Sequence, residues 1–342
     1  MKIGWRGALG FVLSAAFLVW TMREVSFAQV WVVLSQSSLP LFLLSTFVAT
    51  IIFPLRALRW RVILEPVASD VPFGALWRSI AIGMMVNNVV PARAGELARA
   101  YALTREDARV NFAAAFASLA VDRIFDAVTV VVLLVVAMFF SDFPPGTTIS
   151  GQPIIRLAIF AAVVAVGALG ALVAMALFPE LVVRIWDRVI GRVAPRFADR
   201  GRRLLQSFML GLGALRSPVR FARVFGWAFA MWLCTGLSFW LGFLAVGIHA
   251  PYSAALFLMG VIAIGVALPS SPGFFGVFEA AALAGLTLYN VPGDLAVSWA
   301  LGYHLLSFLP ITLIGLYYFL RLGMKFRELG QGDAAASVGA PA

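Results

Sequence analysis

Ionisable and polar residues inside apolar sequence are the groups of this chain that could do chemistry. The first set occupies one string of the sequence and consists of Asn87, Asn88, Arg93, Glu96 and Arg99. Pro91 is typical of the first turn of a helix, and the bare N–H groups of such an end attract anions. A cation such as Arg93 is unfavourable there unless an anion is bound too. The string therefore predicts a phosphate or carboxylate site, with an Arg93–Glu96 pair as the structural alternative.

A second string runs from Pro269 to Glu279 and repeats the same theme. Ser271 followed by Pro272 predicts the N-cap and first residue of a helix. Gly273 and Gly276 would allow a ligand or a neighbouring helix to approach the backbone. Glu279 has two roles of equal weight: pairing with an arginine of the other half of the chain, or contact with substrate or a coupling proton.

A third set lies in the apolar run 112–140 and consists of Asp122, Arg123 and Asp126. Arg123 is spaced to pair with Asp126, and a structural ion-pair network is expected as much as a functional one. Arg56, Arg59 and Arg61 close an earlier span, where head-group anchoring is the default expectation. His304 in the last span could relay protons, but a lone histidine there favours a hydrogen-bonded core residue.

The composition identifies the solvent in which these groups act. Of 342 residues, 62% are hydrophobic and 12% charged, which is typical of an integral membrane protein. The two lysines, Lys2 and Lys325, lie near the chain ends, so a phosphate-binding loop with its lysine is excluded, and with it a nucleotide-driven pump. One cysteine and two histidines are too few for the usual metal patterns, and no cofactor is expected.

The elements that position these groups follow from the apolar runs. The sequence predicts an all-α polytopic membrane protein with six full crossings, at about 8–22, 39–58, 112–140, 154–178, 224–248 and 295–320. Two further runs, 73–103 and 252–289, are interrupted by proline, glycine or polar residues and predict re-entrant helical hairpins. Two true crossings are the alternative for the second run.

Arginine placement predicts the orientation. The segment 179–223 carries ten arginines against three acidic residues and is expected in the cytoplasm, part of it as an amphipathic helix on the membrane. Both termini are then cytoplasmic, in a bacterial inner membrane. The residues about 1–140 and 154–322 form an inverted repeat within one membrane domain, 1–328, followed by a disordered tail, 329–342. The same topology explains the positive charge without nucleic-acid binding.

Four strings together resemble a known family. They are Arg56-x-x-Arg59-Trp60, Asn87-Asn88-x-x-Pro91-x-Arg93-x-Gly95-Glu96-x-x-Arg99, Ser118-x-x-x-Asp122-Arg123-x-x-Asp126 and Pro272-Gly273-Phe274-Phe275-Gly276-Val277-Phe278-Glu279. They resemble the membrane domain of the lysylphosphatidylglycerol synthase/flippase (MprF-type) family over roughly 4–321. The resemblance implies a lipid flippase. The chain ends about twenty residues after its last span, so the synthase domain of two-part members is expected to be absent.

These observations favour a lipid translocase over two alternatives. In this hypothesis Arg93, Asn87 and Asn88 hold an anionic head group between two helix N-termini, while Glu96 and Glu279 balance charge. A membrane-embedded transferase acting on a lipid carrier is the first alternative. A membrane partner of a separate lipid-modifying enzyme is the second. The lipid, the coupling ion and the oligomeric state do not follow from the sequence.

Overall fold

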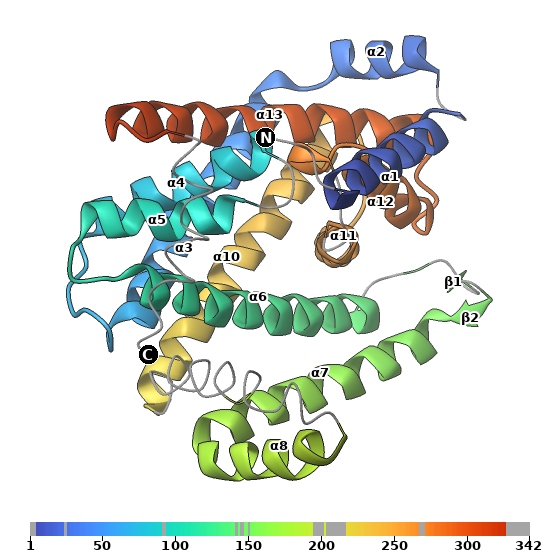
Figure 1. Ribbon diagram of the computed structural model, residues 1–342. Helices are drawn as coiled ribbons and strands as arrows, with labels where there is room; N and C mark the ends of the chain where they lie inside the picture. Colours follow the sequence, from blue (N-terminus) through green and yellow to red (C-terminus); the bar gives the residue numbers. More distant parts are fainter. Residues whose placement is uncertain are drawn as a thin grey trace.

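The computed structural model describes residues 5–23, 26–90, 94–140, 143, 147–149, 151–193, 202, 217–266 and 271–325, and these are mostly helical. The tail 329–342, Arg93 and most of the predicted amphipathic loop beyond 193 lie outside the described residues. Two strands of two residues each, β1 (Thr148–Ile149) and β2 (Gln152–Pro153), form a small antiparallel hairpin between the halves of the chain. Figure 1 shows the helices stacked around a centre crossed by α10.

The described residues of the first half form six helices: α1 (Trp5–Met22), α2 (Phe27–Gln36), α3 (Leu39–Leu64), α4 (Phe73–Val89), α5 (Gly95–Glu106) and α6 (Phe112–Phe140). The bounds of α6 are those predicted from its apolar run. The structure extends α3 six residues beyond the predicted span, so that its three arginines are helical. The short helix α2 was not predicted, because ten residues are too few for a crossing.

The described elements of the second half are α7 (Ile154–Leu177), α8 (Pro179–Val193), α10 (Pro218–Ala245), α11 (Tyr252–Gly265), the 3₁₀ turn η2 (Pro272–Phe274), α12 (Val277–Thr287) and α13 (Gly293–Arg321). The helix α8 carries arginines beside apolar residues, as predicted for an amphipathic segment, and it runs through Gly191 without a break. Ser217 caps α10 by accepting a hydrogen bond from the Arg220 N–H at 3.4 Å.

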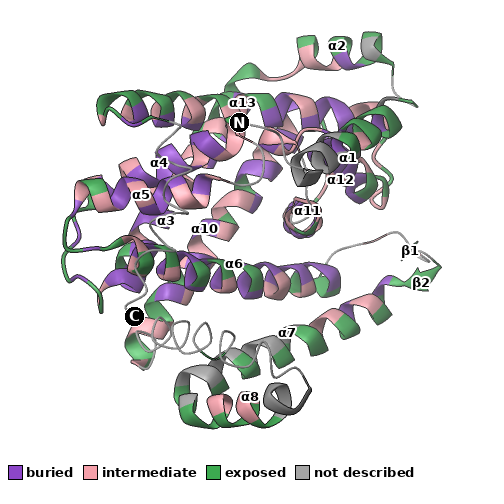
Figure 2. Ribbon diagram, viewed as in Figure 1, coloured by how far each residue is buried: buried purple, intermediate pink, exposed green. Residues whose placement is uncertain are grey.

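Four of the described helices, α3, α6, α10 and α13, are long and apolar enough to cross a membrane. Large apolar side chains such as Phe140, Phe160 and Val166 are at least 70% exposed, as expected of surfaces that face lipid rather than water. Buried residues lie on α3, α4, α5 and α6 of the first half and on α10, α11, α12 and α13 of the second (Figure 2). The chain is therefore a multi-pass membrane protein with an internal packed core.

The first predicted hairpin is present as α4 and α5, which pack against each other. A Cβ added at Gly95 would collide with the Gly83 carbonyl and the Asn87 side chain, so the two helices approach at backbone distance. The Asn87 side-chain oxygen accepts a hydrogen bond from the Gly95 N–H at 2.9 Å and so satisfies a backbone group freed by the break. The described part of the second helix begins at Gly95 rather than near Pro91.

The second hairpin departs from its prediction at the break. The Ser271-Pro272 pair begins only the single turn η2, and Ser271 makes no side-chain cap. Gly273 (φ 68°) and Gly276 (φ 85°) take left-handed backbone conformations that a helix cannot continue through. The helix α12 therefore begins at Val277, five residues later than predicted.

Charged pairs gather the helix ends that were predicted to face the cytoplasm. Arg78 of α4 pairs with Glu106 at the end of α5, with Nε to Oε1 at 2.6 Å. Arg220 and Arg223 of α10 pair with Glu65 at the end of α3, at 3.1 and 2.9 Å. The mouth of the first hairpin thus brings the ends of α4 and α5 together, as a hairpin requires.

Candidate functional site

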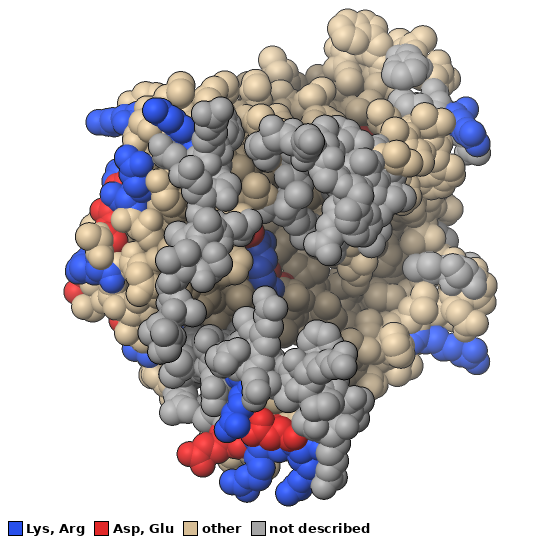
Figure 3. All heavy atoms as spheres, in the orientation of Figure 1, with Lys and Arg blue, Asp and Glu red and all other residues tan. Residues whose placement is uncertain are grey.

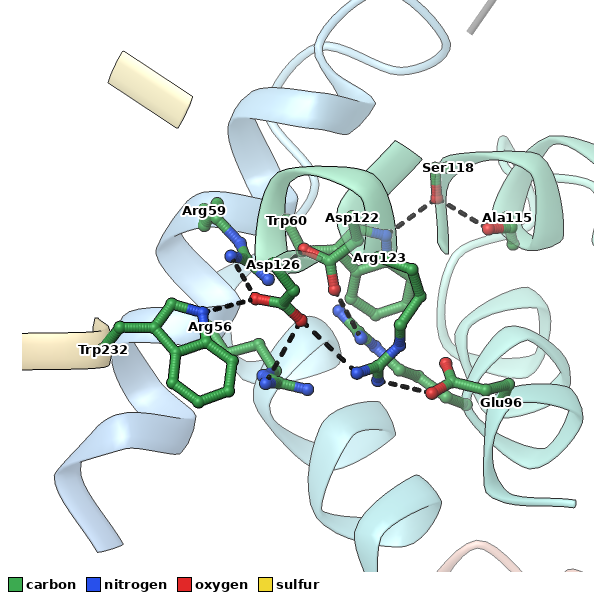
Figure 4. A network of polar contacts seen from close by, with 11 residues as sticks. Arg56, Arg59, Trp60, Glu96, Ala115, Ser118, Asp122, Arg123, Asp126 and Trp232 are labelled. Atoms are coloured by element: carbon green, nitrogen blue, oxygen red, sulfur yellow. Dashed lines mark hydrogen bonds and ion pairs between the residues drawn. The ribbon is translucent and has the colours of Figure 1, made fainter. Parts of the chain in front are cut away.

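A group of charged residues with a buried centre and a partly exposed edge lies where α3, α5 and α6 meet. We call it the charge cluster, and its members are Arg56, Arg59, Glu96, Arg99, Asp122, Arg123 and Asp126. The spacing of three and four residues on each helix places the members on one face, because an α-helix repeats every 3.6 residues. Figure 4 shows the side chains converging, joined by Trp232 from α10.

Arg59 is the centre of the charge cluster. Its side chain is fully buried, with Nη2 at 2.6 Å from Asp122 Oδ1 and Nη1 at 2.7 Å from Asp126 Oδ1. Trp232 donates its indole N–H to Asp126 Oδ1 at 3.0 Å. The expectation that Arg56 and Arg59 anchor head groups at the surface is therefore wrong. Both side chains are at most 10% exposed because acidic residues of α6, distant in the sequence, draw them inward.

The other cations surround this centre. Arg99 donates from Nη1 to Asp122 Oδ2 at 3.0 Å and lies over the ring of Trp60 at 3.9 Å. Arg123 makes the predicted bond to Asp126, at 3.3 Å, and also pairs closely with Glu96 across to α5. Glu96 thus has a partner other than the Arg93 considered from the sequence.

The charge cluster carries more positive than negative groups. Four guanidinium groups face three carboxylates, so one positive charge is not matched among the described residues. Arg56 Nε, Arg99 Nε and Arg99 Nη2 are buried donors that have no hydrogen-bond partner in the described part of the chain. Unmet donors on a buried guanidinium are costly, and an anionic oxygen would satisfy them.

An open cavity of about 470 Å³ begins at the charge cluster and runs between α6, α10 and α11. Arg123, Asp126 and Trp232 form its polar end. The remaining walls are almost entirely apolar, with Val130 of α6 and Met259 of α11 among them. Figure 3 shows basic and acidic atoms at the base of a central hollow in this face. A molecule with a charged head and an apolar tail matches such a cavity.

The remaining predicted site residues lie in the two hairpins and not at this cavity. Asn88 donates a hydrogen bond to Thr312 Oγ1 of α13 at 2.7 Å, and Asn87 caps α5. Ser271 donates its hydroxyl to the Phe275 carbonyl at 3.1 Å. These side chains support the breaks of the hairpins. Arg93 lies outside the described residues.

Among the described residues, Glu279 pairs within its own half rather than with an arginine of the other half. Its Oε1 lies 2.7 Å from His304 Nδ1, and its Oε2 accepts the Gly276 N–H at 2.6 Å. His304 Nε2 lies 2.8 Å from the Gly273 carbonyl oxygen. The expectation of a hydrogen-bonded core histidine is confirmed, with its side chain 9% exposed.

The sequence did not predict that the charge cluster contains Arg56 and Arg59 and is joined by Trp232. The available signal was the i, i+3 arginine pair inside an apolar helix, because two such charges cannot stay unpaired in a membrane. Among the described residues no group of three His, Cys, Asp or Glu side chains is placed to hold a metal ion.

Comparison with known proteins agrees with this membrane architecture. The sequence profile of the lysylphosphatidylglycerol synthase TM region matches residues 7–315. The chain belongs to this family. The matched residues span the four strings noted from the sequence.

Two curated relatives match at lower identity. The chain is 26% identical to glycosyltransferase AglD of Haloferax volcanii over 294 residues, which cover 80% of this chain and 47% of that protein. It is 24% identical to a UPF0104 membrane protein of Pyrococcus horikoshii over 277 residues, covering 76% and 80%. The chain thus spans about half the length of the glycosyltransferase and most of the length of the UPF0104 protein.

Proposed function

We propose that this member of the lysylphosphatidylglycerol synthase TM region family is a lipid translocase, which moves a lipid with an anionic head group between membrane leaflets. The observation that carries the proposal is the position of the charge cluster at one end of an apolar cavity. A charged head group crosses the hydrocarbon core too slowly unaided, because an isolated ion is costly there. A polar cavity inside the protein lowers that barrier.

The head group's phosphate would sit against the charge cluster. Arg99 has two unmet donors on its guanidinium, and Arg56 has a third. A guanidinium fork matches two phosphate oxygens at once, which a lysine cannot do. The extra positive charge of the charge cluster would be neutralised by the phosphate. Arg93 stays a prediction as a further phosphate ligand.

The acyl chains would follow the apolar walls. The cavity falls within the range of about 300–1,000 Å³ that small-molecule sites occupy, at about 470 Å³. It holds a head group and the first part of a tail, while the rest of the tail stays in the bilayer. Its opening between α6, α10 and α11 is lined by side chains suited to contact with lipid, such as Ile264, which is 57% exposed.

The helix contacts support the inverted repeat of six crossings and two re-entrant hairpins. In this repeat α3 corresponds to α10, α4 to α11, α5 to α12 and α6 to α13. The contact of α4 with α13 then corresponds to the contact of α11 with α6, and both are present. The contact of α3 with α13 likewise corresponds to that of α10 with α6. Ser45 of α3 and Ser238 of α10 donate to each other's carbonyl oxygens at 2.7 Å, the reciprocal bonding expected at a two-fold axis.

Two hairpins that enter from opposite faces suit alternating access. The break of the second hairpin, η2, contacts α4 of the first hairpin, so the second break lies against the first hairpin. In transporters with inverted repeats, such broken elements meet at the substrate site near the middle of the membrane. The arginine-rich helix ends would face the cytoplasm, with both termini on that side.

Purified protein in liposomes tests the proposal. Translocation of a fluorescent anionic phospholipid without any added donor supports a translocase. Formation of a glycosylated lipid from a nucleotide sugar would instead support a transferase, the activity in the name of the Haloferax volcanii relative. If neither occurs, the proposal is wrong and a partner subunit is the better interpretation.

A further inference from the structure

We propose that Glu279 and His304 bind one proton between them and that this proton holds the break of the second hairpin closed. The argument begins with hydrogen-bond counting. The Gly273 carbonyl oxygen, 2.8 Å from His304 Nε2, can only accept, so Nε2 must carry a hydrogen. The Glu279 Oε1 atom, 2.7 Å from Nδ1, is an acceptor when the carboxyl group is ionised.

Two short contacts therefore need two hydrogens, but a neutral imidazole supplies one. The missing hydrogen is either on Nδ1, which gives an imidazolium and a carboxylate, or on Oε1, which gives a neutral imidazole and a carboxylic acid. Both forms hold one more proton than a neutral histidine beside an ionised glutamate. Glu279 is fully buried and its other oxygen already accepts the Gly276 N–H, so no other described group supplies that hydrogen.

Loss of that proton to water would break one of the two contacts. An ionised glutamate facing a bare Nδ1 repels it, and turning the ring to donate to Glu279 abandons the Gly273 carbonyl. Either change removes a tie between α13 and the break that precedes α12. The pair thus acts as a proton-dependent lock.

The break is a segment that the lock can release. Gly273, Phe274 and Gly276 all have positive φ angles, and Phe274 is strained in this region because it has a Cβ. Ser14 of α1 accepts a hydrogen bond from the Ser271 N–H at 2.8 Å. The two glycines adopt such angles readily, whereas the strained Phe274 conformation is held by contacts from α1 and α13.

Among the described residues, the charged groups on the helices packed around the pair lie at helix ends or have partners of their own. Asp294 and Arg321 lie in the first and last turns of α13. Arg78 of α4 pairs with Glu106, and Arg56 and Arg59 of α3 pair within the charge cluster. Tyr303 is a neighbouring titratable group in the described part of the chain, and its hydroxyl lies 3.0 Å from the Ser238 hydroxyl. The state of the lock is therefore expected to depend on the proton that Glu279 and His304 share.

Aromatic rings connect the lock to the cavity. The ring of Phe278 lies 4.4 Å from that of His304 and 6.2 Å from that of Phe239, which lines the cavity. Movement of α12 would change this wall. Coupling of proton binding to lipid movement rests on the proposed function, whereas proton binding by the pair does not.

Cysteine labelling tests the lock directly. In a Cys234→Ser background, Ser271→Cys reports on the break and Thr287→Cys, at the exposed far end of α12, serves as the control. The ratio of their maleimide labelling rates cancels the pH dependence of the thiol reaction. Between about pH 5 and about pH 9 we expect this ratio to rise about tenfold, the worth of one charge-assisted hydrogen bond.

Two variants should make the labelling ratio independent of pH, one at a low value and the other at a high value. Glu279→Gln supplies the missing hydrogen permanently, since its amide can donate to Nδ1 while its oxygen accepts the Gly276 N–H, so the ratio should stay low at every pH. His304→Gln cannot make both contacts from the ring positions, so the ratio should stay high.

A flat ratio in the parent protein, or an unchanged rise in His304→Gln, would overturn the proposal. If the expected pattern appears in a protein that translocates no lipid, the proton site stands and its link to transport is wrong.

Discussion

Replacing Arg59, the central arginine of the charge cluster, should destabilise the protein far more than replacing Arg61 on the same helix. Arg59→Met leaves Asp122 and Asp126 buried without the cation that bridges them, although Arg99 and Arg56 still contact one carboxylate each. Removing one partner of a buried ion pair costs about 3–5 kcal/mol. We expect a loss of this size in the free energy of unfolding, measured by denaturant titration in detergent with tryptophan fluorescence as the signal.

The control lies on the same helix. Arg61 is 45% exposed and reaches Asp70 only at 3.9 Å, so Arg61→Met should cost no more than about 0.5 kcal/mol. The double variant Arg59→Met with Asp122→Asn removes one charge of each sign and should recover a large part of the loss. Equal effects of Arg59→Met and Arg61→Met would refute the account of the buried network.

Two further predictions concern the first hairpin. Gly95→Ala should prevent normal packing of α4 on α5, because the added Cβ has no space. As the control, Gly170→Ala in α7 meets no atom within 4 Å and should be neutral or stabilising by up to about 1 kcal/mol. Thermal unfolding of the two variants checks this prediction. In a Cys234→Ser background, cysteines at Arg78 and Arg105 should both be labelled from the cytoplasmic side. Labelling of one of them only from outside would replace the re-entrant hairpin by a true crossing.

The sequence predicted the elements better where local signals decide them. The run 112–140 became α6 with the same bounds, because its apolar residues are flanked by polar ones. The second hairpin was predicted as interrupted, but the Ser271-Pro272 signal for a helix start yielded to the positive φ angles of Gly273 and Gly276. Glycine permits such angles, but the contacts with α1 and α13 that accompany them are not contained in a local pattern.

The sequence predicted most residues of the candidate site, but it did not predict which residues pair with one another. Arg99, Asp122, Arg123 and Asp126 were singled out, but the centre of the network is Arg59. It lies 63 and 67 positions from its two acidic partners, and hydropathy alone favours the surface for an arginine at the end of a span. Long-range pairing reverses that preference, because an arginine between two carboxylates is stable when buried and the carboxylates require it.

The initial rate of phospholipid translocation in proteoliposomes tests the central claim most directly. The parent protein, Arg99→Gln and the exposed control Arg61→Gln are compared at equal amounts of folded protein. Arg99→Gln keeps Asp122 paired with Arg59 but removes the unmet guanidinium donors, so its rate should fall by about tenfold or more, the worth of a hydrogen bond to a charged group. The Arg61→Gln rate should equal that of the parent. An Arg99→Gln protein that translocates phospholipid at the parental rate would contradict the assignment of the charge cluster as the head-group site.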